Sequence, residues 1–184
     1  VKLPSKPMIK SFDFLQAWRT AASNRSAQLL SSWTDYKLYT SLILNNPTCL
    51  LVDVGNALGL EAYPRDYYAV DGLLYSQQDF VPGCPKGQFW FRSLSVAFEH
   101  ENTFNRNVFQ EIAHLLILRA RLSVVVTYTP IYDQELMNYF HSIIQPCHHA
   151  SELDLNESFL MILGRRDPLE WDGYVYKKEG WKKL

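Results

Sequence analysis

Residues 96–102 of this chain read Val96-Ala97-Phe98-Glu99-His100-Glu101-Asn102 and place two carboxylates at the end of an apolar run. In a β-strand, residues i and i+2 point to the same side of the sheet, so Glu99 and Glu101 share one face while Phe98 and His100 take the other. Two like charges about 6.6 Å apart along one strand face repel each other unless solvent or a cation neutralises them. The pattern therefore predicts a strand that carries a divalent-metal site.

One acid also interrupts the strand-like run at residues 67–75, which reads Tyr-Tyr-Ala-Val-Asp-Gly-Leu-Leu-Tyr. Aspartate is depleted in strands and is costly to bury without a partner. Two interpretations of Asp71 follow. In the first, Asp71 caps a bend at Gly72. In the second, it joins Glu99 and Glu101 around Mg²⁺ or Mn²⁺, ions that favour carboxylate oxygens.

The order Asp71, Glu99-x-Glu101, an amphipathic helix and a strand at 122–128 resembles the PD-(D/E)xK restriction-endonuclease-like superfamily. The resemblance covers roughly residues 47–165. It implies an α/β fold in which a helix precedes a strand meander, and a further helix and strand complete the sheet. Asp71 matches the Asp of the family motif and Glu99 matches its second acid. Glu101 stands where the motif has Lys, and some restriction enzymes of the superfamily also carry Glu there.

The resemblance implies a Mg²⁺- or Mn²⁺-dependent nuclease that hydrolyses phosphodiester bonds, with DNA as the expected substrate. Asp71 and Glu99 would hold the metal, which lowers the pKa of a bound water and neutralises charge on the phosphoryl oxygens. Glu101 would bind a second ion or orient the water as a base. The alternative is a catalytically inactive nuclease-like domain that binds a protein or nucleic-acid partner, because the Lys is missing and the chain has no basic stripe.

Further residues are candidates for supporting roles. In the resembling family the helix before the strands often adds another acid, for which Glu61 is the first candidate and Asp53 the reserve; the alternative for both is a solvated helix-end or turn position. Gln110 and His114 are four residues apart on the helix after Glu101, and therefore lie on one face that can turn towards the carboxylates. Gln110 matches the first position of a Gln-x-x-x-Tyr pair found in some of these nucleases.

Three side chains of this set have alternatives of their own. His114 takes the place of the Tyr in that pair, and a core or surface-bound histidine is the other interpretation of it. Lys86 and Arg92 border the loop into the Glu99 strand and are candidates for nucleic-acid phosphate contacts, although solvated positions would also suit them. The run Cys147-His148-His149 has no second ligand cluster at zinc spacing, so no zinc site is predicted there.

The 184 residues with 47% hydrophobic content fit one compact domain. We expect a central mixed sheet flanked by helices, with an arm and helical layer at 1–46 and a nuclease-like α/β core at 47–184. Residues 1–10 read as a loose arm. Expected helices cover 13–33 with a break near 23–24, 36–43 after a cap at Thr34 or Asp35, 47–58 with Pro47 in its first turn, 102–118 and 134–144. Expected strands cover 67–75, 96–102, 122–128, 158–164 and an edge strand at 171–178.

Charge and composition limit the partners. The formal charge of −1 does not mark a strongly basic nucleic-acid binder, although a nuclease can still concentrate its basic residues on one face. Three Cys without a signal peptide predict a reducing, cytoplasmic setting. No apolar run reaches about 18 residues, so no membrane-spanning helix is expected. The N-terminal helices are a candidate surface for a homodimer or a protein partner.

Overall fold

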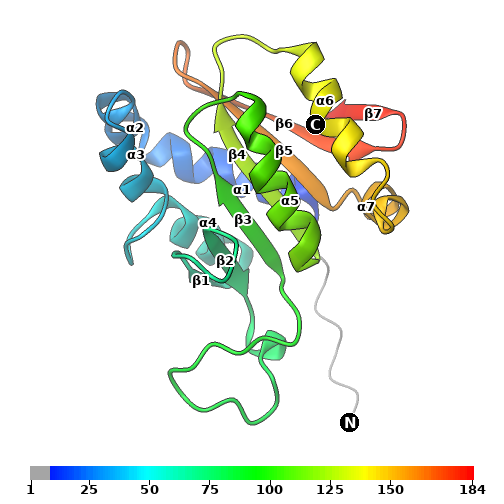
Figure 1. The fold of residues 1–184 in the computed structure, drawn as a ribbon. Coiled ribbons are helices and arrows are strands. Elements are labelled where there is room, and N and C mark those ends of the chain that lie inside the picture. Colours follow the sequence, from blue (N-terminus) through cyan, green and yellow to red (C-terminus); the bar gives the residue numbers. More distant parts are fainter. Residues whose placement is uncertain (1–8) are drawn as a thin grey trace.

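The computed structural model describes residues 9–184 and contains a seven-stranded mixed sheet (Figure 1). The strands lie side by side in chain order. The central strands β3, β4 and β5 are parallel, and all other neighbours are antiparallel. Their bounds are β1 (Glu61–Tyr63), β2 (Gly72–Tyr75), β3 (Val96–His100), β4 (Leu122–Tyr128), β5 (Phe159–Arg165), β6 (Glu170–Lys177) and β7 (Gly180–Lys183).

Helices connect the parallel strands and cover both faces of the sheet. Parallel neighbours need crossover connections, which are α5 between β3 and β4 and the pair α6–α7 between β4 and β5. The bounds are α1 (Ser11–Asn24), α2 (Ser26–Ser32), α3 (Tyr36–Ile43), α4 (Leu50–Leu58), α5 (Phe109–Leu118), α6 (Gln134–Ile144) and α7 (Ala150–Asn156). The prediction of an α/β protein with a mixed sheet and N-terminal helices is thus confirmed.

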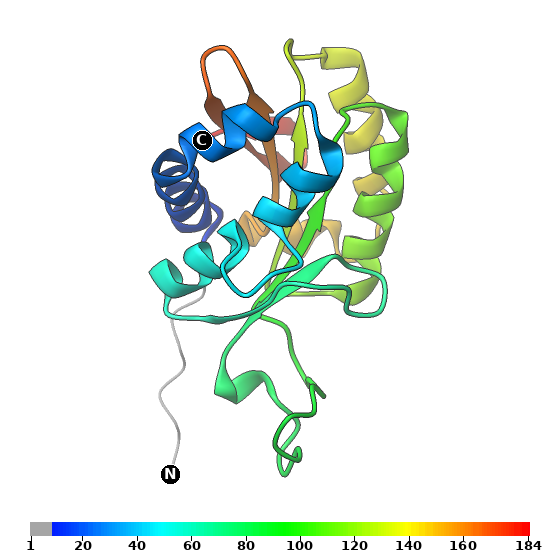
Figure 2. The same cartoon turned by 90° about the vertical axis from the view of Figure 1, so that its left-hand side faces the viewer.

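The two faces of the sheet have separate hydrophobic cores. Helices α1 to α4 lie on one side and α5 and α6 on the other (Figure 2). Phe98 packs in the core under α1, while its neighbour Ala97 packs in the core under α5. This alternation places Glu99 on the α5 side and His100 on the α3 side, where the His100 ring stacks on Tyr39. The face assignment made from residues 96–100 therefore agrees with the structure.

Aromatic side chains join the N-terminal helices to the sheet. The fully buried Trp18 of α1 stacks on Phe98 at 5.6 Å between ring centroids and meets Trp171 of β6 edge-on at 5.4 Å. The expected break after residues 23–24 separates α1 from α2, and Asp35 caps α3 by accepting a hydrogen bond from the Leu38 amide at 3.0 Å. The part of the predicted arm that falls on residues 1–8 lies outside the described residues.

Side-chain hydrogen bonds move two helix starts from their expected places. Asn46 accepts a hydrogen bond from the Thr48 amide at 2.8 Å, which forms a turn, and α4 begins at Leu50 rather than at Pro47. The helix expected from residue 102 begins as a 3₁₀ turn, η2 (Arg106–Val108), and continues as α5. Asn105 accepts from the Asn107 amide at 2.7 Å, so the polar residues before α5 form a loop in place of the first helical turns.

The strand predictions also need corrections. The run at 67–75 is a strand only from Gly72, because residues 67–70 form a tight turn. The expected edge strand at 171–178 is β6, and it is covered by β7, a strand that the sequence did not reveal. Strand β1 and helix α7 were also not predicted. Within residues 9–184, no helix is long and apolar enough to cross a membrane.

Candidate metal centre

Where β2 begins and β3 ends, the Glu99 carboxylate binds the main chain of Asp71, and the Asp71 carboxylate binds the main chain of His100. The backbone amide of Asp71 donates to Glu99 Oε2 at 3.3 Å, and Asp71 Oδ2 accepts from the His100 amide at 2.8 Å. The turn between Tyr67 and Val70 delivers Asp71 to this place, in the bend directly before Gly72. Asp71 thus lies in the bend before Gly72, but its carboxylate binds the His100 amide of β3 and does not cap the bend. Its contact with Glu99 agrees with part of the second interpretation, whose metal ion stays a prediction.

Helix α5 adds an acid and a histidine to the same place. His114 Nδ1 lies 3.0 Å from Glu99 Oε1 and 3.4 Å from Glu111 Oε2. Glu111 and His114 are three residues apart, so they share the helix face that is turned towards the sheet. Potential ligand atoms of Glu99, Glu111 and His114 all lie within 4.8 Å of one another. We call Asp71, Glu99, Glu111 and His114 the acid centre.

The acid centre favours protonated carboxyl groups. Burial, with the added repulsion of Asp71 and Glu111, raises the pKa of Glu99 to about 10. Burial, together with Asp71 and Glu101, raises the pKa of Glu111 to about 7. Burial also raises the pKa of Asp71, against the opposing hydrogen bond from His100. These shifts show that the folded protein holds negative charge here at a cost.

Little positive charge offsets these acids. Within residues 9–184, the ion pairs of Glu99 and Glu111 are both made with His114, which is positive only when it is protonated. Asp71 makes no ion pair with a Lys or Arg in that range. An exposed acid, Asp66, adds to the repulsion that raises the pKa of Asp71. A bound cation would relieve this repulsion.

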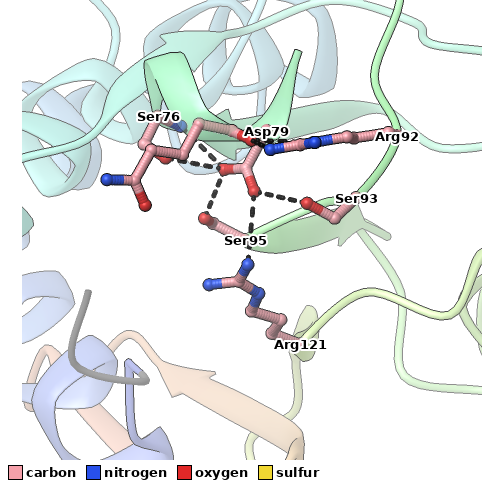
Figure 3. A network of polar contacts seen from close by, with 7 residues as sticks. Ser76, Asp79, Arg92, Ser93, Ser95 and Arg121 are labelled. Carbon is pink, nitrogen blue, oxygen red and sulfur yellow. Dashed lines mark hydrogen bonds and ion pairs between the residues drawn. The ribbon is translucent and has the colours of Figure 1, made fainter. Parts of the chain in front are cut away.

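A second buried acid, Asp79, is surrounded by hydrogen-bond donors that stabilise its negative charge (Figure 3). Burial would raise the pKa of Asp79, yet hydrogen bonds outweigh it and the pKa lies below its ordinary value. Asp79 accepts from the hydroxyls of Ser95 at 2.6 Å and Ser93 at 2.7 Å, from the Ser76 amide at 2.8 Å, and pairs with Arg121 at 3.8 Å. Asp79 thus has several short hydrogen bonds and an arginine partner, whereas Glu99 accepts one longer hydrogen bond from the Asp71 amide and contacts His114.

Replacing Asp79 is expected to destabilise the protein without changing metal affinity. Asp79→Ala leaves the Ser93 and Ser95 hydroxyls without their acceptor in a buried place, which costs about 3 kcal/mol. Urea denaturation would measure the free energy of unfolding, and calorimetry at a temperature where the variant is folded would measure Mn²⁺ affinity. Ser93→Ala, which removes one donor, should cost about 1 kcal/mol. Equal stability of wild type and Asp79→Ala would contradict this structural role.

The Glu101 carboxylate is turned to its own loop. Its Oε1 accepts from the Thr103 amide at 3.0 Å and from the Thr103 hydroxyl at 3.2 Å. The Glu101 amide still bonds the Val126 carbonyl at 2.9 Å, so its main chain continues the pairing of β3 with β4. Its charge contributes to the raised pKa values of Asp71 and Glu111. Glu101 therefore lies beside the acid centre as a neighbouring charge.

The supporting acids of the preceding segment lie elsewhere. Glu61 in β1 accepts from the Tyr75 hydroxyl at 3.2 Å and from Gln77 Nε2 at 2.6 Å. Its register partner Tyr75 stands four residues beyond Asp71, about 13 Å along the strand. Asp53, the reserve, pairs with Arg25 at 2.6 Å. The structure thus brings neither of them to the acid centre.

Three of the predicted supporting residues are exposed, and within residues 9–184 none of them forms a hydrogen bond or ion pair with the acid centre. They are Gln110, Lys86 and Arg92. Gln110 lies on the solvent side of α5, one residue before Glu111. Lys86 lies in the long loop between β2 and β3, and this loop extends from the body of the molecule in Figures 1 and 2. The Arg92 guanidinium in the same loop donates to the Gln78 carbonyl at 3.3 Å.

Sequence reasoning missed Glu111 and Asp66. The available signal for Glu111 was its i,i+3 spacing to His114, which is as good a helical pairing as the i,i+4 spacing of Gln110. Choosing between the two needs the direction in which α5 meets the sheet, and the apolar residues Ile112 and Leu115 fix it. Asp66 has no local signal, because only the turn at 67–70 brings it near Asp71.

A second group of potential ligands lies at the start of α7. Donor atoms of Cys147, His148 and His149 lie within 4.8 Å of one another, and Cys147 Sγ is 3.1 Å from His149 Nδ1. Burial and the neighbouring Arg119 lower the pKa of His149. The three residues are consecutive, so their proximity follows largely from the chain and is weaker support for a site than convergence of separate elements.

Comparison of the chain with protein-family models, with curated proteins and with solved structures found no match.

Proposed function

We propose that this protein is a metal-dependent nuclease that hydrolyses phosphodiester bonds, with a core similar to that of the restriction-endonuclease-like superfamily. The observation that carries the proposal is the convergence of Asp71, Glu99 and Glu111 from a turn, a strand and a helix, without a Lys or Arg to neutralise them within the described residues. Raised pKa values at a cluster of acids are typical of functional sites.

The order of elements supports the proposal. Helix α4 precedes the antiparallel meander β1–β2–β3, and α5 with β4 completes the sheet parallel to β3. This order is the one that the resemblance implies for the core at 47–184. Asp71 directly before β2 and Glu99 near the end of β3 would correspond to the two acids of that motif. A similar fold does not by itself assign an activity, so the activity is proposed from the residues of the acid centre.

The donor set fits a hard divalent ion. Carboxylate oxygens suit Mg²⁺ and Mn²⁺, and the imidazole of His114 suits Mn²⁺ in addition. Glu99, Glu111 and His114 offer ligand atoms within 4.8 Å of one another, and Asp71 would join them through its contact with Glu99. Such a site binds metal in competition with protons, because the raised pKa values mean that carboxyl protons must leave first.

We expect the residues in and beside the acid centre to have different roles. The ion, when bound, lowers the pKa of a water ligand and neutralises charge on the phosphoryl group. Glu111, whose burial and acidic neighbours raise its pKa to about 7, is suited to accept a proton from the attacking water near neutral pH. His114 contacts both Glu99 and Glu111 and so fixes their side chains relative to each other. Glu101 holds the loop through Thr103.

The second candidate function is an inactive nuclease-like domain that binds a partner. It is favoured by the missing Lys of the motif, by the formal charge of −1 and by the engagement of Glu101 with Thr103. It predicts that the acids act as a hydrogen-bonded polar patch. Metal binding decides between the two candidates.

Calorimetric titration with Mn²⁺ and Mg²⁺ tests the proposal, with wild type beside Glu99→Gln. We expect binding to wild type at or below millimolar metal, with at least a tenfold weaker affinity in Glu99→Gln, because the amide is a poorer ligand than the carboxylate. Glu61→Gln is the matched control, since it removes an acid outside the acid centre. Plasmid and single-strand cleavage with the same proteins follows. If wild type binds no metal at millimolar concentration, with or without oligonucleotide, the proposed nuclease has no cofactor. That result would favour the inactive domain that binds a partner.

A further inference from the structure

A cleft lies at the carboxyl end of the parallel strands, on the α3 side of the sheet, whereas Glu99 of the acid centre is on the α5 side. Its volume is about 480 Å³, a size typical of small-molecule sites. Aromatic residues from α3 and β4 and from the segment between α2 and α3 form one part of its wall, and the loops after β3, β4 and β5 form the rest. The lining residues that carry the argument are Trp33, Tyr36, Tyr39, Tyr128, Arg165 and Arg166.

The aromatic wall is rigid and ends in one exposed ring. The rings of Trp33, Tyr39 and Tyr128 meet edge to face, with centroids 5.1 to 5.3 Å apart. Tyr36 in the first turn of α3 lines the same cleft and is 58% exposed, which is unusual for a large aromatic side chain that serves only the core. A flat apolar group would find a stacking surface here.

Two buried polar atoms in the lining lack hydrogen-bond partners within the described residues. The Tyr39 side chain is almost fully buried, and its hydroxyl lies near that of Tyr128 without the geometry of a hydrogen bond. Arg165 Nε is the second atom. Buried polar groups are rarely left unpaired in a folded protein, so the residues that line the cleft carry two hydrogen-bonding groups without a partner among the described residues.

The two arginines of the cleft are held differently. Arg165 is fixed by Glu170 at 2.6 Å and Asp172 at 3.1 Å. Arg166 is half-exposed, and its one ion pair within residues 9–184 is a loose contact of 3.8 Å to Asp167, whose side chain is 88% exposed. The Arg166 guanidinium is therefore free to receive an anion such as a phosphate group.

Two short chains of contacts run from the cleft, one to Glu101 beside the acid centre and one to Asp71 within it. Thr103 lines the cleft and binds the Glu101 carboxylate at 3.0 Å through its amide. His100 binds Asp71 through its main-chain amide at 2.8 Å, and its ring Nε2 lies 2.8 Å from the Tyr128 hydroxyl. Both sites lie at the carboxyl end of the parallel strands, so a polymer chain that crosses this end of the sheet would reach both faces.

We propose that the cleft binds one unpaired nucleotide of a single-stranded nucleic acid, with its base against Tyr36 and its phosphate at Arg166. This inference rests on the proposed function, because it gives the substrate class of the strand that is cut at the acid centre. A base must be unpaired to stack on a side chain in such a cleft, which favours single strands or splayed ends over intact duplex.

The test is binding of a fluorescent single-stranded oligonucleotide of about 12 nucleotides, measured by anisotropy in EDTA so that no cleavage occurs. Tyr36→Ala is expected to weaken binding about tenfold, as does the loss of one stacked base, while the matched Tyr36→Phe keeps wild-type affinity. Arg166→Ala is expected to weaken binding and to lower the slope of log affinity against log salt by about one.

The outcomes separate this inference from the proposed nuclease. If Tyr36→Ala and Arg166→Ala bind the oligonucleotide as tightly as wild type, or if wild type does not bind it at low salt, the inference is wrong, even where Glu99-dependent Mn²⁺ binding is found. If both variants lose binding while Glu99→Gln keeps it, the inference is supported, even where no cleavage occurs. Equal preference of wild type for a blunt duplex of the same length would also overturn it.

Discussion

The metal-free protein is expected to lose stability as the pH rises from about 5 to 9, and the Glu99→Gln variant is expected to lose much less. In the unfolded chain Glu99 releases its proton near its ordinary pKa of 4.5, whereas in the folded protein burial and the charges of Asp71 and Glu111 raise that pKa to about 10. Between these two values the unfolded state binds fewer protons, so the free energy of unfolding falls as the pH rises.

Glu99 sets the size of this effect. One proton contributes at most about 1.4 kcal/mol for each pH unit, and Glu111 adds its share between its ordinary value and about 7. Glutamine has the shape of the protonated acid and stays neutral, so Glu99→Gln should be at least ~2 kcal/mol more stable than wild type near pH 8.

Urea denaturation of metal-free wild type, Glu99→Gln and the control Glu61→Gln over this pH range would measure the difference. Glu61→Gln removes a carboxylate that binds Tyr75 and Gln77 outside the acid centre, so its slope should match that of wild type. Saturating Mn²⁺ should raise the stability of wild type and leave Glu99→Gln almost unchanged, because a ligand stabilises only the state that binds it. Parallel curves for wild type and Glu99→Gln would mean that Glu99 is not held protonated.

The faces of the sheet that the side chains of residues 96–100 occupy could be predicted from the sequence, because successive side chains of a strand point to opposite faces. Phe98 belongs with the aromatic rings of α1, and the structure places it against Trp18. The pattern could not locate the end of the strand. Beyond His100 the chain turns into a loop that Glu101 itself stabilises through Thr103, a local hydrogen bond that competes with continued strand geometry.

Only part of the acid centre could be predicted from the sequence, for a related reason. Asp71 and Glu99 were found because a charge inside an apolar run is costly and therefore informative. Glu111 lies on the polar side of α5 with Gln110 and His114, where an acid carries no such signal. Its role depends on how α5 rotates against β3, which is a tertiary contact. The short strands β1 and β7 were missed because their stability comes from pairing with β2 and β6.

Cleavage of a single-stranded substrate is expected to fall about a thousandfold in Asp71→Asn and Glu99→Gln, measured as kcat/KM with saturating Mn²⁺. Both carboxylates lie at the junction of β2 and β3, and neither has a Lys or Arg partner within the described residues to take over its charge. Glu111→Gln should lose about a hundredfold, which is the typical loss when a proton acceptor is removed. Glu101→Gln should lose only about tenfold or less, because an amide oxygen can still accept from Thr103.

The expected order of these losses in kcat/KM differs from the order that the sequence motif alone would predict. If the resemblance to the PD-(D/E)xK motif held residue by residue, Glu101 would stand in the place of the motif's Lys, and its loss should be as severe as that of Glu99. In the structure Glu111 has taken the position next to Glu99, through their shared contact with His114. A loss in Glu101→Gln equal to that in Glu99→Gln would therefore show that the Glu101 side chain leaves Thr103 and turns inward when substrate binds. Gln110→Ala is the control on α5, since its exposed side chain lies one residue from Glu111 and is expected to leave kcat/KM unchanged.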